Sequence, residues 1–333
     1  MTRELFFSGQ DFTHVQQPHR SRNLLSRLVG TVMVGVVRGV FAFSRALGPE
    51  RSGALGAAIT RTFGPLLKPH RTALANIRAA YPEKSDAEVK AIALAAWDNL
   101  GRTGGEYPHL GRLFDFDPES AVPGRTEVDG IDHFLSLRDD GKPGIVFSAH
   151  LANWELPAIC AARFGLDTTA VFRAPNDPAI ARVLHEIRSE TMGSLEAARQ
   201  GAAFAMQGAL EKGGHLGMLI DQHFTRGVIV TFMGRPALVN PILGKFARRF
   251  DCPVHGVRVI RLPNHRFRLE LTPPLDLPRD PDGQINVQGA MQAMTAVVEE
   301  WVRQYPEQWL WMHRRWRAPA KASDPKVGST FGI

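Results

Sequence analysis

The order of apolar and polar residues along the chain predicts strands that alternate with helices. Short apolar runs are separated by longer amphipathic stretches from residue 144 to residue 271. The runs predicted as strands are Gly144–Ala149, Thr168–Arg173, His215–Asp221, Val228–Phe232, Pro253–Arg261 and Arg266–Leu271. The stretches predicted as helices are Asn153–Phe164, Asp177–Glu196, Ala202–Lys212 and Pro241–Phe250. This alternation is typical of an α/β fold, in which helices cover both faces of a mixed central sheet.

Helical periodicity is also predicted on either side of this region. Between Arg71 and Gly105 apolar residues recur at helical spacing, and Ser85-Asp-Ala-Glu88 has the form of a capping box that starts a helix. A last long helix is predicted over Val287–Trp301, where apolar residues are spaced by three and four. The tail Ala318–Ile333 has too little apolar content to pack, so we expect it to be flexible.

The most apolar stretch, Leu24–Leu47, is long enough to cross a bilayer but contains Arg27, Arg38 and Arg45. At about 100° per residue these arginines share one face of a helix, opposite an apolar face. Such a helix is typical of one that lies in the headgroup plane, because a spanning helix would bury Arg38 at about 3 kcal/mol or more. We expect a membrane-associated helix; a spanning helix and a soluble core helix are the alternatives.

Composition and charge narrow the class of protein. The chain has 333 residues, 44% hydrophobic and 22% charged, as expected of a folded globular protein. Its formal net charge of +7 favours an anionic partner such as phospholipid, a phosphorylated glycolipid or nucleic acid. Cys160 and Cys252 lack the spacing of a disulfide framework or a zinc site, which favours a reducing, cytosol-facing protein. Residues 1–23 are polar, so we expect no secretory leader there.

The turn after the first of these strands carries the clearest candidate chemistry. The sequence Phe147-Ser-Ala-His150-Leu-Ala-Asn-Trp-Glu155 runs from a strand into a helix, a junction that projects from the carboxyl edge of a sheet. From the first helical turn, the carboxylate of Glu155 can orient one nitrogen of His150 and leave the other to take a proton from a hydroxyl. By spacing alone, a structural role for His150 explains the pattern better, because a lone histidine after a strand is more often a structural residue.

Further motifs, in chain order, favour the catalytic interpretation. His150-Leu-Ala-Asn-Trp-Glu155 resembles the His-x4-Glu motif of the bacterial lipid A biosynthesis acyltransferases, relatives of the glycerol-phosphate acyltransferases. Other segments that resemble this family are Arg71-x-x-Leu-x-Asn76-Ile, Asn99-Leu-Gly101-x-x-x-x-Glu106, Phe172-Arg173-Ala-Pro175, Asp221-Gln222, Phe232-Met-Gly234-Arg235 and Trp309-Leu-Trp311-Met-His313-Arg-Arg315-Trp316. The resemblance spans residues 71–317. It departs from the family at His223, where many members carry a second acid, and at Met233, which replaces an aromatic residue.

The resemblance implies transfer of a fatty acyl chain from acyl carrier protein to a hydroxyl of a lipid A precursor, in lipopolysaccharide biosynthesis. The acyltransferase would act at an anionic membrane surface, the inner membrane, with its catalytic domain facing the cytoplasm. A thioester has a good leaving group, so a general base and donors to the oxyanion suffice, with no cofactor or metal implied. His150 would be the base and Glu155 would orient it. The candidate substrate-binding residues are Arg173, Asp221 and Asn153.

The same resemblance suggests how the chain is divided. We expect a polar segment over 1–23, the membrane-associated helix over 24–47, an acyltransferase domain over 48–317 with a glycerol-phosphate acyltransferase-like fold, and the flexible tail over 318–333. The helical subregion before the first strand would belong to that domain.

Other interpretations stay open. Arg173 is also explained as a surface charge at a strand end, and Asp221 with His223 lacks the third ligand of a metal site. The aromatic and basic residues of Trp309–Arg317 fit a membrane interface better than nucleic acid, so no nucleic-acid partner is expected. Acylation of a glycerophospholipid or another glycolipid is one alternative function. A catalytically silent, basic membrane-binding protein is another.

Overall fold

A computed structural model describes residues 24–172, 178–198 and 201–316 of the chain. The predictions for residues 1–23 and 318–333 lie outside the described residues. Four helices open the described chain: α1 (Leu24–Leu47), α2 (Pro49–Phe63), α3 (Lys68–Ala80) and α4 (Asp86–Glu106). The later helices are α5 (Leu110–Leu113), α6 (Ile131–Asp139), α7 (Leu156–Arg163), α8 (Pro178–Ser189), α9 (Ala202–Glu211), α10 (Ile242–Phe250) and α11 (Val287–Gln304). Short 3₁₀ turns are η1 (Gly64–Leu66), η2 (Tyr107–His109) and η3 (Pro306–Gln308).

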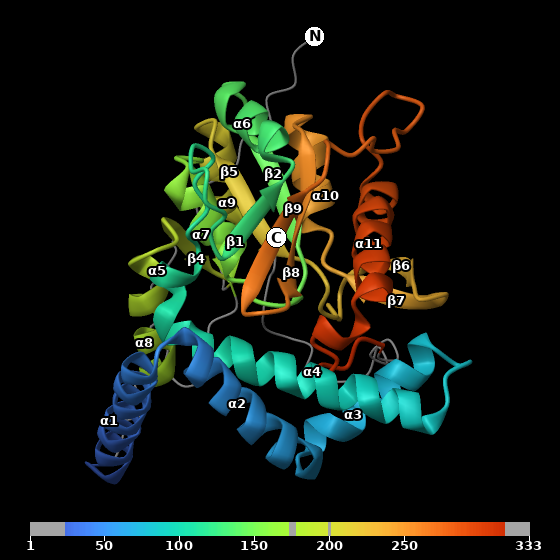
Figure 1. Cartoon of the computed structure of the whole chain (residues 1–333). Coiled ribbons are helices and arrows are strands. Elements are labelled where there is room, and N and C mark those ends of the chain that lie inside the picture. The colour runs from blue at the N-terminus through green and yellow to red at the C-terminus, as the bar shows by residue number, and fades with distance from the viewer. Residues whose placement is uncertain (1–23, 173–177, 199–200, 317–333) are drawn as a thin grey trace.

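The strands form one large sheet and one hairpin (Figure 1). The large sheet contains β1 (Thr126–Asp129), β2 (Gly144–Ser148), β3 (Thr168–Phe172), β4 (Ser194–Ala197), β5 (His215–Leu219), β8 (Val254–Leu262) and β9 (Arg266–Leu271). Its order is β1-β9-β8-β2-β5-β3-β4, and every neighbouring pair is parallel except β8 with β9. The hairpin pairs β6 (Val228–Phe232) with β7 (Arg235–Val239). The predicted α/β class with a mixed central sheet is confirmed.

Local signals in the sequence account for several element boundaries. The predicted capping box forms at the start of α4, where the Ser85 hydroxyl accepts from the Glu88 backbone and the Glu88 carboxylate accepts from the Ser85 backbone. At the other end of the chain, α11 begins after Asn286, whose side chain accepts a hydrogen bond from the Gly289 backbone. Both caps satisfy backbone N–H groups that have no partner inside the helix.

The structure corrects the predicted elements in three places. Helix α8 ends at Ser189 instead of continuing to Glu196, because Gly193 (φ 68°) turns the chain into β4. The predicted strand Val228–Phe232 forms, but it pairs with β7 outside the large sheet. Strand β1 and helix α6 form between residues 105 and 144, where the sequence analysis predicted no element.

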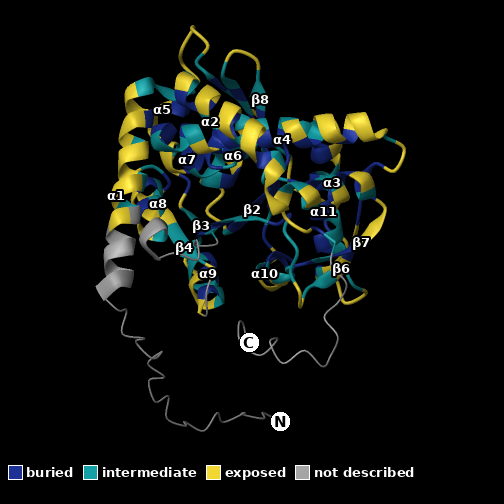
Figure 2. Ribbon diagram, turned by 90° about the horizontal axis from the view of Figure 1, so that it is seen from below, coloured by how far each residue is buried: buried dark blue, intermediate teal, exposed yellow. Residues whose placement is uncertain are grey.

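Two hydrophobic clusters lie on the two faces of the large sheet. Successive residues of β2 point to opposite faces, so Ile145 and Phe147 join one cluster while Val146 packs against the other. In the first cluster the ring of Phe147 stacks on Trp301 of α11, with centroids 5.8 Å apart. Figure 2 shows the buried residues at the sheet and the exposed residues on the outer sides of the helices. The sheet is therefore packed between two layers of helices. This packing fixes the positions of the strand ends, where the candidate site described below lies.

Helix α1 forms with the predicted bounds, and Arg38 and Arg45 of the predicted basic stripe contact the protein body. Arg38 lies 3.5 Å from Glu186 of α8, and Arg45 donates to the carbonyl of Pro108. These two arginines therefore do not face only the solvent, although the side chain of Arg38 is 64% exposed. Among the described residues, no helix combines the length and apolar character needed to cross a membrane.

Helices α2 and α4 approach closely through glycines. A Cβ atom on Gly101 would lie 2.1 Å from the Thr60 hydroxyl and 2.3 Å from the Gly56 carbonyl oxygen. A Cβ atom on Gly56 would lie 2.1 Å from the Gly101 carbonyl oxygen. Only glycine permits this distance between the two backbones. The contact fixes α2 against α4, which in turn supports the functional site described below.

We predict that Gly101→Ala lowers the free energy of unfolding by about 1–3 kcal/mol, because the added methyl group forces the two backbones apart. Gly104→Ala is the matched control, since it lies on the same helix with nothing within 4 Å of its Cβ position. It should leave stability unchanged or raise it by up to about 1 kcal/mol. Urea titrations of both variants measure the difference. Equal effects would contradict the close contact.

Candidate active site

Two parallel strands bring His150 and Asp221 together. Ser148 at the end of β2 is in register with Leu219 at the end of β5, and the backbone of Ile220 donates to the Ser148 carbonyl. His150 follows the first strand by two residues and Asp221 follows the second by two. Carboxyl ends of adjacent parallel strands open at the same sheet edge, so the two side chains meet there.

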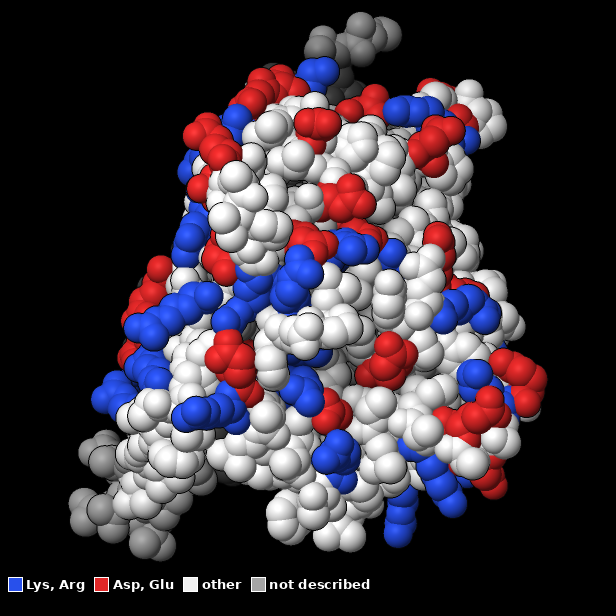
Figure 3. Space-filling view, viewed as in Figure 1, with Lys and Arg blue, Asp and Glu red and all other residues white. Residues whose placement is uncertain are grey.

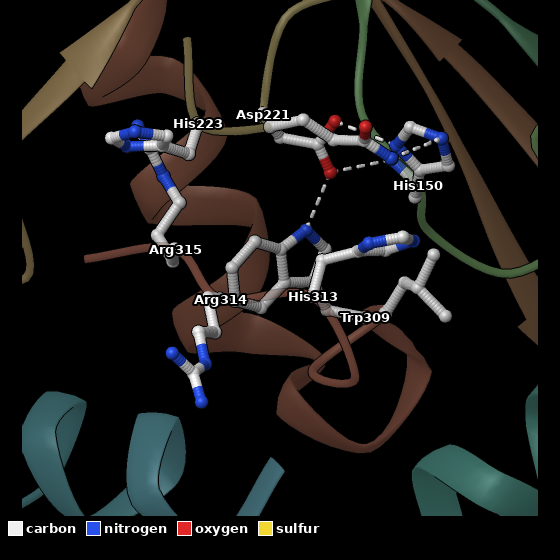
Figure 4. A pocket seen from close by; sticks show the side chains of 9 residues that line it. His150, Asp221, His223, Trp309, His313, Arg314 and Arg315 are labelled. Atoms are coloured by element: carbon white, nitrogen blue, oxygen red, sulfur yellow. Dashed lines mark hydrogen bonds and ion pairs between the residues drawn. The ribbon is translucent and has the colours of Figure 1, made fainter. Parts of the chain in front are cut away.

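The carboxylate of Asp221 accepts three hydrogen bonds (Figure 4). Its Oδ1 lies 2.7 Å from Nδ1 of His150, and its Oδ2 accepts from the His150 backbone N–H at 2.8 Å. The indole Nε1 of Trp309 donates to Oδ2 at 2.7 Å. The side chain of Asp221 is only 2% exposed and holds His150, and its expected contact with substrate stays a prediction.

These contacts determine the charge of Asp221 and the tautomer of His150. Burial alone would raise the pKa of Asp221, but the charge of His150 and the hydrogen bonds from His150 and Trp309 outweigh it and hold this pKa at about 2. An ionised carboxylate can only accept a hydrogen bond, so Nδ1 of His150 carries the hydrogen in its contact with Asp221. The amide nitrogen of Gln222 lies 3.3 Å from Nε2 of His150, which suits an unprotonated Nε2. We therefore assign the Nδ1–H tautomer to the neutral ring.

Glu155 does not form the predicted hydrogen bond with His150. Its carboxylate accepts from Nε and Nη2 of Arg188 at 3.0 and 2.5 Å, in a pair whose side chains are 7% and 15% exposed. The guanidinium of Arg188 also lies over the rings of Tyr107 and Phe172. The expectation that Glu155 orients His150 directly is wrong, because Arg188 takes both of its oxygens. Glu155 instead anchors α8 beside the start of α7.

Asn153 is also placed differently from the prediction. It is fully buried, and its amide donates to the Glu106 carboxylate at 2.9 Å. Glu106 pairs in turn with Arg261, whose Nε donates to Asn99 at 2.9 Å. The substrate-binding role expected of Asn153 is corrected to a structural one, because no part of its side chain faces solvent. Arg173 lies outside the described residues.

The turn between β2 and α7 is held by the C-terminal segment. Ala152 has a positive φ of 47°, and its N–H donates to the Gln308 carbonyl at 3.0 Å. The backbone of Leu310 donates to the His150 carbonyl, and Leu151 forms a β-bridge with Trp309. This pairing places the indole of Trp309 where it donates to Asp221.

Two buried asparagines hold this C-terminal segment in turn. The amide of Asn76 donates to the carbonyls of Trp311 and His313, at 2.8 and 2.6 Å. The amide of Asn99 donates to the Gln308 carbonyl at 3.0 Å. Both asparagines belong to motifs quoted in the sequence analysis. These motifs do not reach the pocket; they support it by binding backbone carbonyls of the C-terminal segment.

A small and shallow pocket, partly open to solvent, lies beside His150. It is lined by His150, Asp221, Gln222, His223, Trp309, Leu310, His313, Arg314 and Arg315 (Figure 4). Among these, the sequence singled out Gln222, Trp309, His313 and Arg315 only as parts of motifs and assigned them no contact in the site. Among the described residues, no group of three His, Cys, Asp or Glu side chains is arranged to hold a metal ion.

Arg315 is the most buried cation of the pocket, at 2% exposure. Its Nη1 donates to the Leu238 carbonyl at 3.2 Å, and its guanidinium lies 4.9 Å from the centroid of the Phe232 ring. Burial lowers the pKa of Arg315 to about 10, so the side chain is still charged at neutral pH. The pocket thus joins a hydrogen-bonded histidine to a buried positive charge.

Comparison with known proteins gives consistent matches. The family model described as bacterial lipid A biosynthesis acyltransferase matches residues 19–318. The lipid A biosynthesis myristoyltransferase of Escherichia coli K12 is 24% identical over 252 residues, which cover 73% of this chain and 73% of that protein. Lipid A biosynthesis acyltransferase 1 of Shigella flexneri is similar to this chain to the same extent, with 24% identity and 73% coverage of each protein.

We predict that acid removes the stabilisation provided by the Asp221 carboxylate. Its pKa is about 2 in the folded protein against an ordinary value of 3.8, so the stabilisation is complete above about pH 4 and disappears as pH falls toward 2. The free energy of unfolding of wild type minus that of Asp221→Asn should shrink by about 2 kcal/mol over this window. Urea titrations at several pH values measure it. A difference independent of pH would contradict the lowered pKa.

Proposed function

Since the chain belongs to the bacterial lipid A biosynthesis acyltransferase family, we propose that it transfers a fatty acyl chain from acyl carrier protein to a hydroxyl of a lipid A precursor. The observation that carries this proposal is the pair of His150 and Asp221 at the pocket. An imidazole held through Nδ1 by a carboxylate is suited to remove a proton with Nε2. Transfer from a thioester to a hydroxyl requires one such step.

In the proposed reaction, Nε2 of His150 takes the proton of the acceptor hydroxyl while its oxygen attacks the thioester carbonyl carbon. The resulting tetrahedral oxyanion collapses, the carbon–sulfur bond breaks, and the thiolate takes the proton back from the imidazolium. Asp221 stabilises the imidazolium between these two transfers. The acceptor hydroxyl would occupy the position at Nε2 that the Gln222 amide takes in this structure.

The location of the protein is part of the proposal. We infer that α1 and α2 lie against the inner membrane on its cytoplasmic side, because they carry a row of exposed apolar side chains. This apolar surface continues through η1 as far as the residue before α3. It consists of Val32, Val36, Val40, Phe43, Leu55, Ile59, Phe63, Leu66 and Leu67, each 42–79% exposed. In Figure 3 uncharged residues cover much of the lower edge, where α1 and α2 lie. Exposed Arg51 and Arg61 of α2, with exposed Lys68 at the start of α3, suit anionic headgroups.

Arg173 stays a prediction as a contact of the acceptor. Because the acceptor class is phosphorylated, an arginine with its planar fork of donors suits it. The resemblance of Phe172-Arg173-Ala-Pro175 to the family supports this role.

We predict that His150→Ala and Asp221→Asn each reduce acyl transfer by about 10²–10⁴-fold. The first variant removes the base; the second leaves an amide that cannot stabilise the imidazolium. Transfer from acyl carrier protein to a lipid A precursor is measured on purified, folded proteins. Near-normal turnover in either variant would overturn the assigned pair.

Glu155→Gln distinguishes the two carboxylates. Because it leaves the buried Arg188 without its ionised partner, it should lower the free energy of unfolding by about 3–5 kcal/mol. Its turnover should fall less than that of Asp221→Asn when both are assayed well below their melting temperatures. The reverse order, with Glu155→Gln inactive and Asp221→Asn active, would return the orienting role to Glu155.

We predict that Val40→Asp together with Phe43→Asp weakens binding to vesicles containing anionic phospholipid, because both side chains belong to the apolar surface. Phe204→Asp on α9 is the matched control, as its side chain is 80% exposed outside that surface. Vesicle flotation separates bound from free protein. If the double variant floats as well as the control, the surface does not bind the membrane.

A further inference from the structure

We propose that Arg315 is a positioning residue for the proposed base: its buried positive charge offsets the negative charge of Asp221, so that the ring of His150 stays unprotonated at neutral pH. The inference rests on the proposed function, because it concerns how His150 is prepared to take a proton. It assigns a role to a residue that the reaction described above does not use.

Arg315 is a buried arginine without a carboxylate in salt-bridge contact. Three other arginines with largely buried side chains, Arg188, Arg258 and Arg261, pair with Glu155, Glu270 and Glu106 respectively. Among the described residues, Arg315 forms no such ion pair, and its Nε has no hydrogen-bond partner. Its guanidinium contacts two neutral groups, the carbonyl of Leu238 and the ring of Phe232. A buried charge in such surroundings is costly unless an opposite charge lies nearby.

Asp221 supplies the opposite charge. Both residues line the pocket beside His150, and both line a second small cavity bounded by β6 and α11. Among the described residues that line these two cavities, Asp221 is the only acidic one. Its charge keeps the pKa of Arg315 higher than burial alone would leave it. The C-terminal segment therefore acts on Asp221 twice, through the hydrogen bond from Trp309 and through the charge of Arg315.

The other charged or titratable side chains of the surrounding elements are not buried. They are His223 after β5, Arg235 on β7, Glu299 on α11, and His313 and Arg314 on the C-terminal segment. Glu299 is moreover paired with Arg303 of its own helix. Solvent screens the charge of such groups more strongly than it screens a buried charge. Asp221 and Arg315 are therefore the charges that act most strongly on the His150 ring.

The direction of the effect follows from the buried charge in each protonation state of His150. With Arg315 present, the three side chains together are neutral when the ring is neutral and carry one positive charge when the ring is protonated. Without Arg315, the same two states carry one negative charge and no charge. Because a buried net charge is unfavourable, Arg315 favours the unprotonated ring. Only an unprotonated ring can take a proton from a hydroxyl.

NMR titration of the histidine rings tests this coupling without any acyl transfer, with the His150 signals assigned by their loss in His150→Ala. In Arg315→Met the midpoint of the His150 titration should lie about one pH unit above that of wild type, as expected on removal of one buried unit charge. Arg315→Lys keeps the charge and should titrate close to wild type.

Arg314→Gln is the matched control. Arg314 is the preceding residue, it is exposed, and its guanidinium extends away from Asp221 (Figure 4). Its removal should shift the midpoint much less, because solvent screens its charge. An unchanged or lowered midpoint in Arg315→Met, or an equal shift in Arg314→Gln, would overturn the proposal.

If Arg315→Met does not fold, the wild-type protein still provides the test. The Nε resonance of Arg315, identified by its absence in Arg315→Lys, should move with the same midpoint as the His150 ring, because coupling between two sites is reciprocal. An Arg315 resonance that stays constant through the His150 titration would overturn the proposal.

The pH dependence of acyl transfer separates this role from a structural one. Below both midpoints, kcat/KM of Arg315→Met should be about tenfold lower than that of wild type, and above both midpoints it should approach that of wild type. A loss of the same size at every pH would overturn the proposal. A wild-type protein that shows the coupling by NMR but transfers no acyl chain would instead overturn the proposed function.

Discussion

The carboxylate of Asp221 connects three segments that are far apart in the chain. It accepts hydrogen bonds from the backbone and ring of His150 after β2, it stands itself after β5, and it accepts from the indole of Trp309 near the C-terminal end of the described chain. A buried carboxylate is costly unless such donors surround it. The low pKa of Asp221 follows from these donors, and so does the proton on Nδ1 of His150. Both the proposed base and the wall of the pocket depend on this one group.

Other buried polar contacts hold the turn that carries His150, on the side away from the pocket. Glu106 of α4 pairs with Arg261 of β8 and accepts from Asn153 in the turn after β2. The Glu155–Arg188 pair ties α8 to the same turn. Each charge in these pairs needs its partner because both are withdrawn from water, so removal of one destabilises the other. The glycine contact between α2 and α4 extends this support to the helices that carry the apolar surface.

The sequence allowed correct prediction of features that depend on local pattern. Alternating apolar runs indicated the α/β sheet, a capping box marked the start of α4, and strand ends placed His150 at the carboxyl edge of the sheet. The partner of His150 was misassigned, because Glu155 is near in sequence whereas Asp221 reaches it only through the β2–β5 pairing. Arg188, which takes Glu155, lies on a helix whose position depends on tertiary packing. Strand order, the Trp309 contact and the burial of Asn153 likewise depend on contacts across the chain, which periodicity does not encode.

The protonation of the His150 ring tests the central claim most directly. Nitrogen-15 NMR of the side chain, in protein labelled at histidine and assigned with His150→Ala, distinguishes the two neutral tautomers without any substrate. We predict that the neutral ring carries its proton on Nδ1 in wild type, and that Asp221→Asn shifts the population toward Nε2–H while Glu155→Gln does not. A wild-type ring protonated at Nε2, or one whose tautomer responds to Glu155→Gln but not to Asp221→Asn, would contradict the assignment of Asp221 as the group that prepares His150 to act as a base.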